Sequence, residues 1–254
     1  MSVLLIDAGN TRIKWARCAD GDLGVVHAAA HARWGAADYS RRVVGSGGGL
    51  ERILVASVAG PKLRGALARA ARRAQVPIMF VTVPRRGGGV TVGYLEPWRL
   101  GVDRFVALVA ARHLFPGVPV CVAGVGTALT LDLLGQRGRH CGGAILPGPA
   151  LMVQALLTRT HGIRRRAQGG APRSRGPFAR STRAAIEQGA RYAAAAAIDR
   201  AVDEGSVYVG RSPLVVLTGG GAREVRSLVR SSCVGVPDLV LKGLAVLAGR
   251  EPRR

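Results

Sequence analysis

"VLLIDAGNTRIKWA", residues 3–16, joins two apolar runs through a turn of small and polar residues. The first run is typical of a buried strand, and the second, at 12–18, predicts a strand that returns beside it. Asn and Gly favour a tight turn, so an ordinary hairpin is one interpretation. The other is a phosphate-binding turn, because Gly9 lets backbone amides approach closely while Thr11 and Lys14 add a hydroxyl and a cation. The turn alone leaves both interpretations open.

The sequence that follows this hairpin predicts an α/β fold. "RILVASV" (52–58) and "PIMFVTV" (77–83) are nearly continuous apolar runs, as in strands covered on both faces. "KLRGALARAARRA" between them has helical spacing, which gives a β-α-β unit. A third strand of the meander is predicted at 25–31, and a helix at 103–115. Together these elements predict a mixed sheet with flanking helices.

The same order of elements begins again near Gly117. "VPVCVAGVGTALTLDLLGQRGRHCGGAILPG" predicts three strands, and its first turn repeats a glycine and a threonine at Gly126 and Thr127. We therefore predict an internal duplication, with an N-terminal half at 1–116 and a C-terminal half at 117–254.

The C-terminal half carries further predicted elements. Helices are expected at 149–160 and over "STRAAIEQGARYAAAAAIDRAVDEG", which is rich in alanine. Residues 161–180 are dense in Arg, Gly and Pro and predict a mobile loop, either a solvated charge run or a lid for an anionic ligand. "PLVVLTGGGA" predicts a strand followed by a glycine cluster at 217–222, which could receive adenine or ribose. "DLVLKGLAVLAGR" is predicted to open as a strand and to end as a helix.

The composition limits the possible partners of the chain. The formal net charge of +22 favours anionic ligands. However, aromatic residues make up only 4%, too few for a base-stacking platform, so a nucleic-acid partner is not expected. No apolar stretch approaches the roughly 20 residues of a membrane helix, and we expect a soluble, cytoplasmic protein. The four cysteines and five histidines form no spaced metal-binding cluster, and the histidines are left out of the predicted chemistry.

Asp103 and Arg104 follow a glycine at the start of the helix predicted at 103–115. Asp103 could simply be the N-cap of that helix, with Arg104 on the surface. Alternatively, Asp103 accepts a proton from an attacking hydroxyl while Arg104 binds an anion. Because an ionised aspartate is a weak base for an alcohol, positioning and charge neutralisation would have to carry most of such a phosphoryl transfer.

A series of motifs resembles the type III pantothenate kinases, a family of the actin/Hsp70/sugar-kinase superfamily. The matching stretches, in family order over essentially the whole chain, are "DAGNTRIK", "YLEPWRLGVDR", "GTALTLD", "GGAILPGPALM", "ST" at 181–182 and "DLVLKGLA". The resemblance implies two duplicated RNase H-like halves, each a mixed sheet with flanking helices. It also implies ATP-dependent phosphorylation of pantothenate, the first step of coenzyme A synthesis.

The resemblance further implies a role for individual residues. Asp103 aligns with the general base, Thr127 with an ATP phosphate contact and Thr182 with a substrate contact. Asp7 is implied to hold Mg²⁺ through water. The implied first phosphate loop consists of Asp7, Ala8, Gly9, Asn10, Thr11, Arg12, Ile13 and Lys14, and the implied pantothenate site of Tyr94, Gly101, Val102, Asp103 and Arg104.

One position departs from the family pattern. Many members have Asp-x-Gly-Thr at the second turn, and that Asp helps to bind K⁺ or NH₄⁺, whereas this chain has Gly124-Val125-Gly126-Thr127. We expect ligation by carbonyl groups or a weakened cation dependence. The family also implies a homodimer, for which the Ala-rich helix is a candidate surface. Two alternatives stay open: a non-catalytic regulatory protein like the Bvg accessory factor, and a kinase for another small alcohol.

Overall fold

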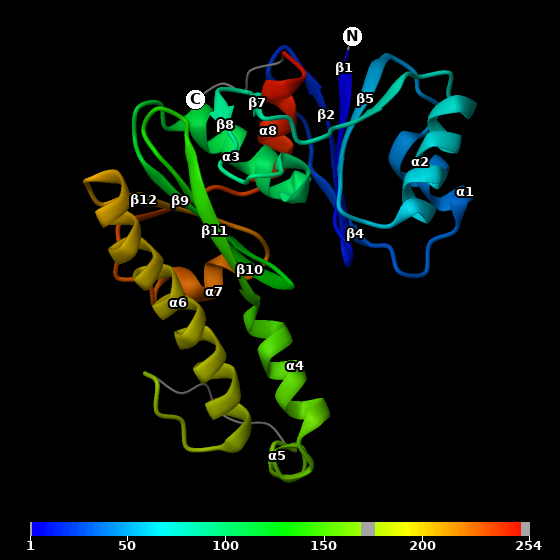
Figure 1. Cartoon of the computed structure of the whole chain (residues 1–254). Coiled ribbons are helices and arrows are strands. Elements are labelled where there is room, and N and C mark those ends of the chain that lie inside the picture. The colour runs from blue at the N-terminus through cyan, green and yellow to red at the C-terminus, as the bar shows by residue number, and fades with distance from the viewer. Residues whose placement is uncertain (1, 169–175, 250–254) are drawn as a thin grey trace. The chain divides into compact units, whose positions relative to one another are not determined.

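The computed structural model describes residues 2–168 and 176–249, which form two compact units (Figure 1). The first unit contains residues 2–116, 138–140 and 238–249, and the second contains 117–137, 141–168 and 176–237. The main break follows residue 116, where the sequence pattern begins to repeat. The units differ from the halves predicted at 1–116 and 117–254 because the last helix belongs with the first unit.

The first unit contains a mixed sheet built around the opening hairpin. Its strands are β1 (Ser2–Ala8), β2 (Arg12–Ala19), β3 (Asp22–Leu23), β4 (His27–Ala30), β5 (Leu50–Ser57) and β6 (Ile78–Phe80). The order is β3-β2-β1-β5-β6, and β4 also pairs with β2. β1 and β2 are antiparallel, whereas β1, β5 and β6 run parallel. The predicted hairpin and β-α-β unit are both confirmed.

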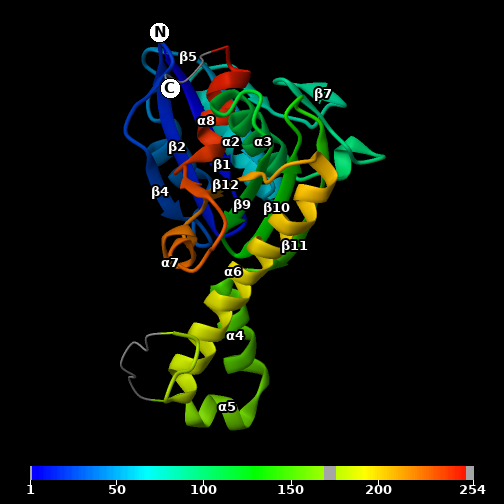
Figure 2. The same cartoon turned by 90° about the vertical axis from the view of Figure 1, so that its left-hand side faces the viewer.

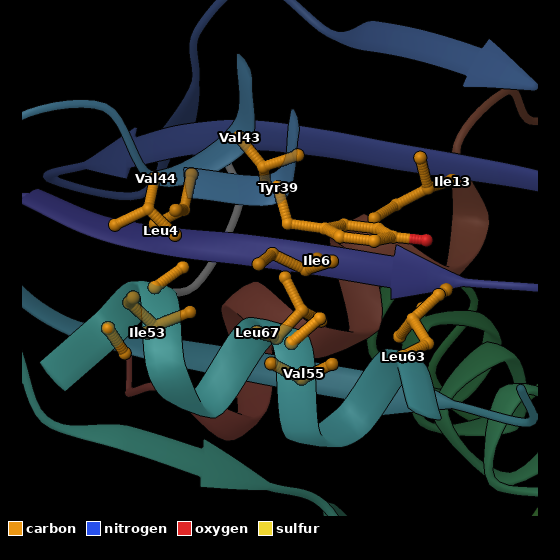
Figure 3. Packing of buried hydrophobic residues seen from close by; sticks show 14 of the residues in the cluster. Leu4, Ile6, Ile13, Tyr39, Val43, Val44, Ile53, Val55, Leu63 and Leu67 are labelled. Carbon is orange, nitrogen blue, oxygen red and sulfur yellow. The ribbon is translucent and has the colours of Figure 1, made fainter. Parts of the chain in front are cut away.

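Helices cover both faces of this sheet. The first face carries α1 (Ala36–Asp38), the π-helical segment η1 (Tyr39–Val44) and α2 (Pro61–Arg73). Figure 3 shows Leu63 and Leu67 of α2 directed toward β1 and β5, where Ile6 and Val55 belong to the same buried cluster. The run at 52–58 is largely buried in β5 as predicted, whereas the prediction of a strand covered on both faces is wrong for 77–83: β6 is the last strand of the sheet, and Met79 is 52% exposed.

The second face of the sheet carries α3 (Val102–Leu114) and α8 (Leu239–Leu247), and α8 contacts β1, β2 and β5. The two helices approach closely at Gly243, where a Cβ atom would lie 2.0 Å from the carbonyl oxygen of Val106. Only glycine permits this crossing. The short elements β7 (Arg86–Gly87), β8 (Val90–Thr91) and the 3₁₀ turn η2 (Pro97–Arg99) precede α3.

The second unit repeats the sheet order of the first. Its strands are β9 (Val120–Val125), β10 (Ala128–Leu134), β11 (His140–Pro147), β12 (Leu214–Thr218) and β13 (Cys233–Gly235), in the order β11-β10-β9-β12-β13. β9 pairs antiparallel with β10 and parallel with β12, as β1 pairs with β2 and β5. The helices are α4 (Pro149–Arg159), α5 (His161–Arg166), α6 (Thr182–Val209) and α7 (Ala222–Arg226), and α4 packs along α6 (Figures 1 and 2). The predicted fold class is confirmed.

Two local predictions are wrong. The segment from Leu239 to Leu247 is helical throughout, because the run "LVL" fits a buried helix as well as a strand and packs against α3. Residues 161–166 of the predicted loop form α5, which begins with a hydrogen bond from the Arg164 amide to the Thr160 carbonyl (3.1 Å). Residues 169–175 of that predicted loop lie outside the described residues. None of the helices in the described part of the chain is long and apolar enough to span a membrane.

Candidate active site

The first predicted phosphate turn closes the hairpin between β1 and β2. Gly9 donates its amide hydrogen to the Arg12 carbonyl (3.0 Å), and Asn10 and Thr11 are exposed at the tip. Asp7 and Lys14 face each other across the two strands, and Ala8 pairs with Ile13. The turn therefore presents polar groups beside one carboxylate and one ammonium.

Asp7 belongs to a charged cluster in the first unit. The pKa of Asp7 is raised from 3.8 to about 7, chiefly by burial and next by the negative charge of Asp103. The positive charge of Lys14 lowers this pKa, and the negative charge of Asp238 raises it further. Asp103 thus acts electrostatically on the end of β1 although it is 96 residues further along the chain. The predicted base, lysine and first carboxylate are brought together.

Asp238 is the member of this cluster that sequence reasoning missed. Its Oδ1 atom accepts a hydrogen bond from Nζ of Lys14 at 2.8 Å, and both side chains are partly buried. Asp238 lies just before α8 with φ of +53°, in the left-handed region that aspartate tolerates better than most residues. It opens the motif "DLVLKGLA", but nothing in the local sequence indicates that it meets Lys14.

Asp103 lies in the first turn of α3, where Gly101 is the N-cap. The interpretation of Asp103 as the N-cap is therefore wrong. Its Oδ1 atom accepts a hydrogen bond from the Arg104 amide at 2.9 Å. A Cβ atom at Gly101 would lie 2.6 Å from that oxygen, so glycine leaves the space in which the carboxylate lies. Val102, between Gly101 and Asp103, is the first residue of the helix.

Tyr94 and Arg104, both predicted in the substrate site, meet directly. Nη1 of the buried Arg104 donates to the Tyr94 hydroxyl at 3.2 Å. The Tyr94 ring stacks on His140, with centroids 5.6 Å apart, and Arg85 donates to the carbonyl groups of Tyr94 and Leu95 at 2.5 Å each. Sequence reasoning missed His140 and Arg85, because stacking and side-chain to backbone contacts leave no spacing pattern.

The second predicted phosphate turn, Gly126-Thr127, belongs to the second unit. The Gly126 amide donates to the Ala128 carbonyl (2.9 Å), and Thr127 is exposed. The amide of Gly148, just before α4, donates to the Thr127 carbonyl at 2.8 Å. A Cβ atom at Gly148 would lie 2.1 Å from the Gly126 carbonyl oxygen, so the start of α4 packs directly on this turn.

The glycine cluster after β12 packs on the end of β9. Gly219 has φ of +93°, and a Cβ atom there would lie 2.4 Å from the Val125 carbonyl oxygen. That oxygen accepts a hydrogen bond from the Gly221 amide at 3.0 Å. The cluster thus leads from β12 into α7 at the same sheet edge as the Gly126-Thr127 turn.

A cavity of about 870 Å³ lies between α4, α6 and α7 in the second unit. Thr182, the predicted substrate contact, is the first residue of α6, and the Ser181 hydroxyl caps that helix by accepting from the Ala184 amide (3.2 Å). The charged residues that line the cavity are Arg183, Glu187, Arg191, Arg223 and Glu224.

At Gly124 the structure explains why no side chain is present. A Cβ atom there would lie 2.7 Å from Oγ1 of Thr130, its partner on β10. The threonine hydroxyl therefore fills the space that a residue larger than glycine would need.

Comparisons with known proteins identify the family of the chain. The sequence model of the type III pantothenate kinases matches residues 3–204. The chain belongs to this family. Type III pantothenate kinases from Nitrosococcus oceani and Herminiimonas arsenicoxydans are 36% and 39% identical to it, covering 97% of the chain and 93% and 97% of their own lengths. The kinase therefore phosphorylates pantothenate, with ATP as co-substrate, in coenzyme A synthesis.

Solved structures confirm the fold. A Baf family protein from Campylobacter jejuni matches with a TM-score of 0.63 at 17% identity, over 97% of both chains. Component A of (R)-2-hydroxyglutaryl-CoA dehydratase from Acidaminococcus fermentans matches with a TM-score of 0.56 at 14% identity, over 98% and 96%. Because the family model and the curated relatives are named as kinases, the non-catalytic alternative is not favoured.

Proposed function

We propose that Asp103 is the general base of this pantothenate kinase. The primary hydroxyl of pantothenate gives its proton to the Asp103 carboxylate while its oxygen bonds to the γ-phosphorus and the bond to the leaving ADP breaks. The position of Asp103 is the observation that carries the proposal: the Arg104 amide holds its carboxylate at the start of α3, where Arg104 also contacts Tyr94. Its influence on the pKa of Asp7, beside the first phosphate turn, supports this placement. Tyr94, Arg104 and Thr182 would orient the alcohol, with Gly101 and Val102 completing that site.

The phosphate groups of ATP would contact residues 7–14 and Thr127. Exposed Asn10 and Thr11 offer an amide and a hydroxyl, and Lys14 offers a positive charge beside them. Because aspartate is a weak base, this neutralisation of charge supplies most of the catalysis in the proposed mechanism. The nucleoside would lie in the cavity between α4, α6 and α7, where arginines can contact adenine and ribose.

The residues present fit a Mg²⁺ ion that arrives with ATP. Within the described residues, no group of three or more His, Cys, Asp or Glu side chains could form a protein cage for a metal. Mg²⁺ commonly uses one or two carboxylates together with substrate phosphates and water, so Asp7 would hold it through water. When bound, the ion would neutralise charge on the transferred phosphate.

We propose that the monovalent-cation dependence of this kinase is weak. Gly124 offers no carboxylate, and Thr130 fills the adjacent space. ATP consumption with and without pantothenate, repeated in sodium and in potassium buffers, tests the substrate and the cation together. Equal rates in both buffers are expected, and a strong requirement for K⁺ would contradict this part of the proposal.

The test of the base is Asp103→Asn. We expect turnover to fall by a factor of about 10³, since proton acceptance is lost while the shape of the side chain is kept. Binding of pantothenate and ATP should remain largely intact. Glu96→Gln, on the exposed turn before α3, is the control and should keep normal turnover. An active Asp103→Asn enzyme would remove Asp103 from the mechanism.

We also propose a cytoplasmic homodimer. The exposed apolar side chains on β11 and α6, Ile145, Val207 and Tyr208, support a surface covered by a second copy. Sedimentation of the wild type and of Tyr208→Asp tests the dimer, which the substitution should weaken. Fractionation of cells tests the location.

A further inference from the structure

The carbonyl group of Gly9, inside the first phosphate turn, accepts a hydrogen bond from a histidine. Nε2 of His31 lies 2.8 Å from that oxygen, and the imidazole is only 8% exposed. A carbonyl oxygen can only accept, so Nε2 carries the proton. In the neutral ring, Nδ1 is then an acceptor, and it lies 3.1 Å from the hydroxyl of Tyr39, which donates to it.

Tyr39 holds this histidine from within the core. The tyrosine is 5% exposed, and Figure 3 shows its ring beside Ile6 and Ile13, which come from the two strands of the hairpin. Trp34 meets the same ring edge to face, with centroids 5.3 Å apart. A packed aromatic ring therefore fixes the imidazole, and the imidazole fixes the turn.

The planarity of the peptide bond carries this anchoring to the tip of the turn. In a trans peptide, the carbonyl of Gly9 and the amide of Asn10 point in opposite directions. Because the carbonyl is directed at buried His31, the Asn10 amide is directed to the opposite side of the turn. The Gly9 amide is already used by the Arg12 carbonyl, so it cannot take over the role of the Asn10 amide.

We propose that His31, supported by Tyr39, is a positioning residue that orients the Asn10 amide toward the phosphates of ATP. The inference rests on the proposed phosphate-binding role of the hairpin turn. His31 acts through the backbone and touches no substrate. A preformed amide costs no reorganisation when the anion arrives, so its loss should weaken ATP binding selectively.

Two polar substitutions of His31 form a matched test. The amide nitrogen of Gln can take the place of Nε2, whereas the shorter Asn reaches only as far as Nδ1. We expect His31→Asn to raise the KM for ATP about tenfold and His31→Gln to raise it less than about threefold. The KM for pantothenate should stay within about twofold in both variants. Tyr39→Phe keeps the ring and loses the hydroxyl, so its KM for ATP should lie between those of His31→Gln and His31→Asn.

Controls separate positioning from folding. His27→Asn removes an exposed histidine that stacks on Trp15 and should leave the KM for ATP unchanged. Far-UV circular dichroism and the midpoint of thermal unfolding report on the fold and should be nearly the same in all variants. A structural effect would instead lower the unfolding midpoint and raise both KM values together.

The outcomes distinguish this inference from the proposed function. If His31→Asn leaves the KM for ATP unchanged while Lys14→Ala raises it, the turn binds phosphate and the role of His31 is wrong. If neither variant changes that KM, the proposed phosphate-binding role of the turn fails. Equal increases in His31→Asn and His31→Gln would also overturn the inference, since only one of them has lost the donor.

Discussion

Replacement of Asp7 by Asn should stabilise the folded protein at pH 8 and leave its stability near pH 4 unchanged. Folding raises the pKa of Asp7 from 3.8 to about 7, chiefly through burial. Between these values the native state keeps a proton that the unfolded chain has lost. Stability therefore falls as the pH rises through this window and levels off above about pH 7. An asparagine has no such titration.

The size of the effect follows from the same pKa values. A rise from 3.8 to about 7 corresponds to about 4 kcal/mol between the protonation states. Because Asp7 is partly exposed, solvent reduces this figure, and we expect about 2 kcal/mol at pH 8. For a chain of this length, that is a gain of about 4 to 8 °C in Tm.

The assay is thermal unfolding of the wild type and Asp7→Asn between pH 4 and 8.5, without Mg²⁺ or nucleotide. The gap in Tm should open between pH 4 and 7 and then stay constant. Asp203→Asn, which removes an exposed carboxylate from α6, controls for the change in net charge. A gap that is absent at pH 8, or equal at every pH, would refute the reasoning. The stabilised variant should also be a poor kinase, since the proposed Mg²⁺ contact is lost.

Two further predictions concern the packing of α8 on α3 and the ion pair between Lys14 and Asp238, the residue before α8. Gly243→Ala should destabilise the protein by about 1 to 3 kcal/mol in urea unfolding, because a Cβ atom would lie 2.0 Å from the Val106 carbonyl oxygen. Gly189→Ala on α6 has open space around it and should be neutral or stabilising; an equal loss in both variants would contradict the packing argument. Lys14→Ala, Asp238→Ala and the double variant should show a coupling of about 0.5 to 1 kcal/mol that weakens in high salt. Strict additivity would mean that the ion pair contributes nothing.

Much of the fold could be predicted because the periodicity of a strand or helix is visible within a short stretch of sequence. The apolar runs that became β1 and β5 and the helical spacing of α2 were recognised correctly, since strand and helix periods are set by neighbouring residues. The ambiguous case was "LVL" at the start of α8. A short apolar run fits both periods, and only its packing on α3 decides the outcome.

The residues of the candidate site also fall into those that local patterns predicted and those that they missed. Glycine and hydroxyl residues indicated the two turns proposed to bind phosphate, and the place of Asp103 at a helix start, together with the family motifs, indicated the proposed base. Asp238, His31 and His140 were missed, because each acts through a contact with a residue far away in the sequence. No spacing within a segment records such a contact.

By itself, the sequence determined most of the main strands and helices, the duplication, the two glycine turns and the family. The tertiary structure decided which charges meet: it brought Asp103 and Asp238 to the hairpin that carries Asp7 and Lys14. It also decided that a buried imidazole, rather than the turn alone, fixes the Gly9 carbonyl. The physical reason is that backbone preferences act over a few residues, whereas charge and burial depend on what the folded chain brings close.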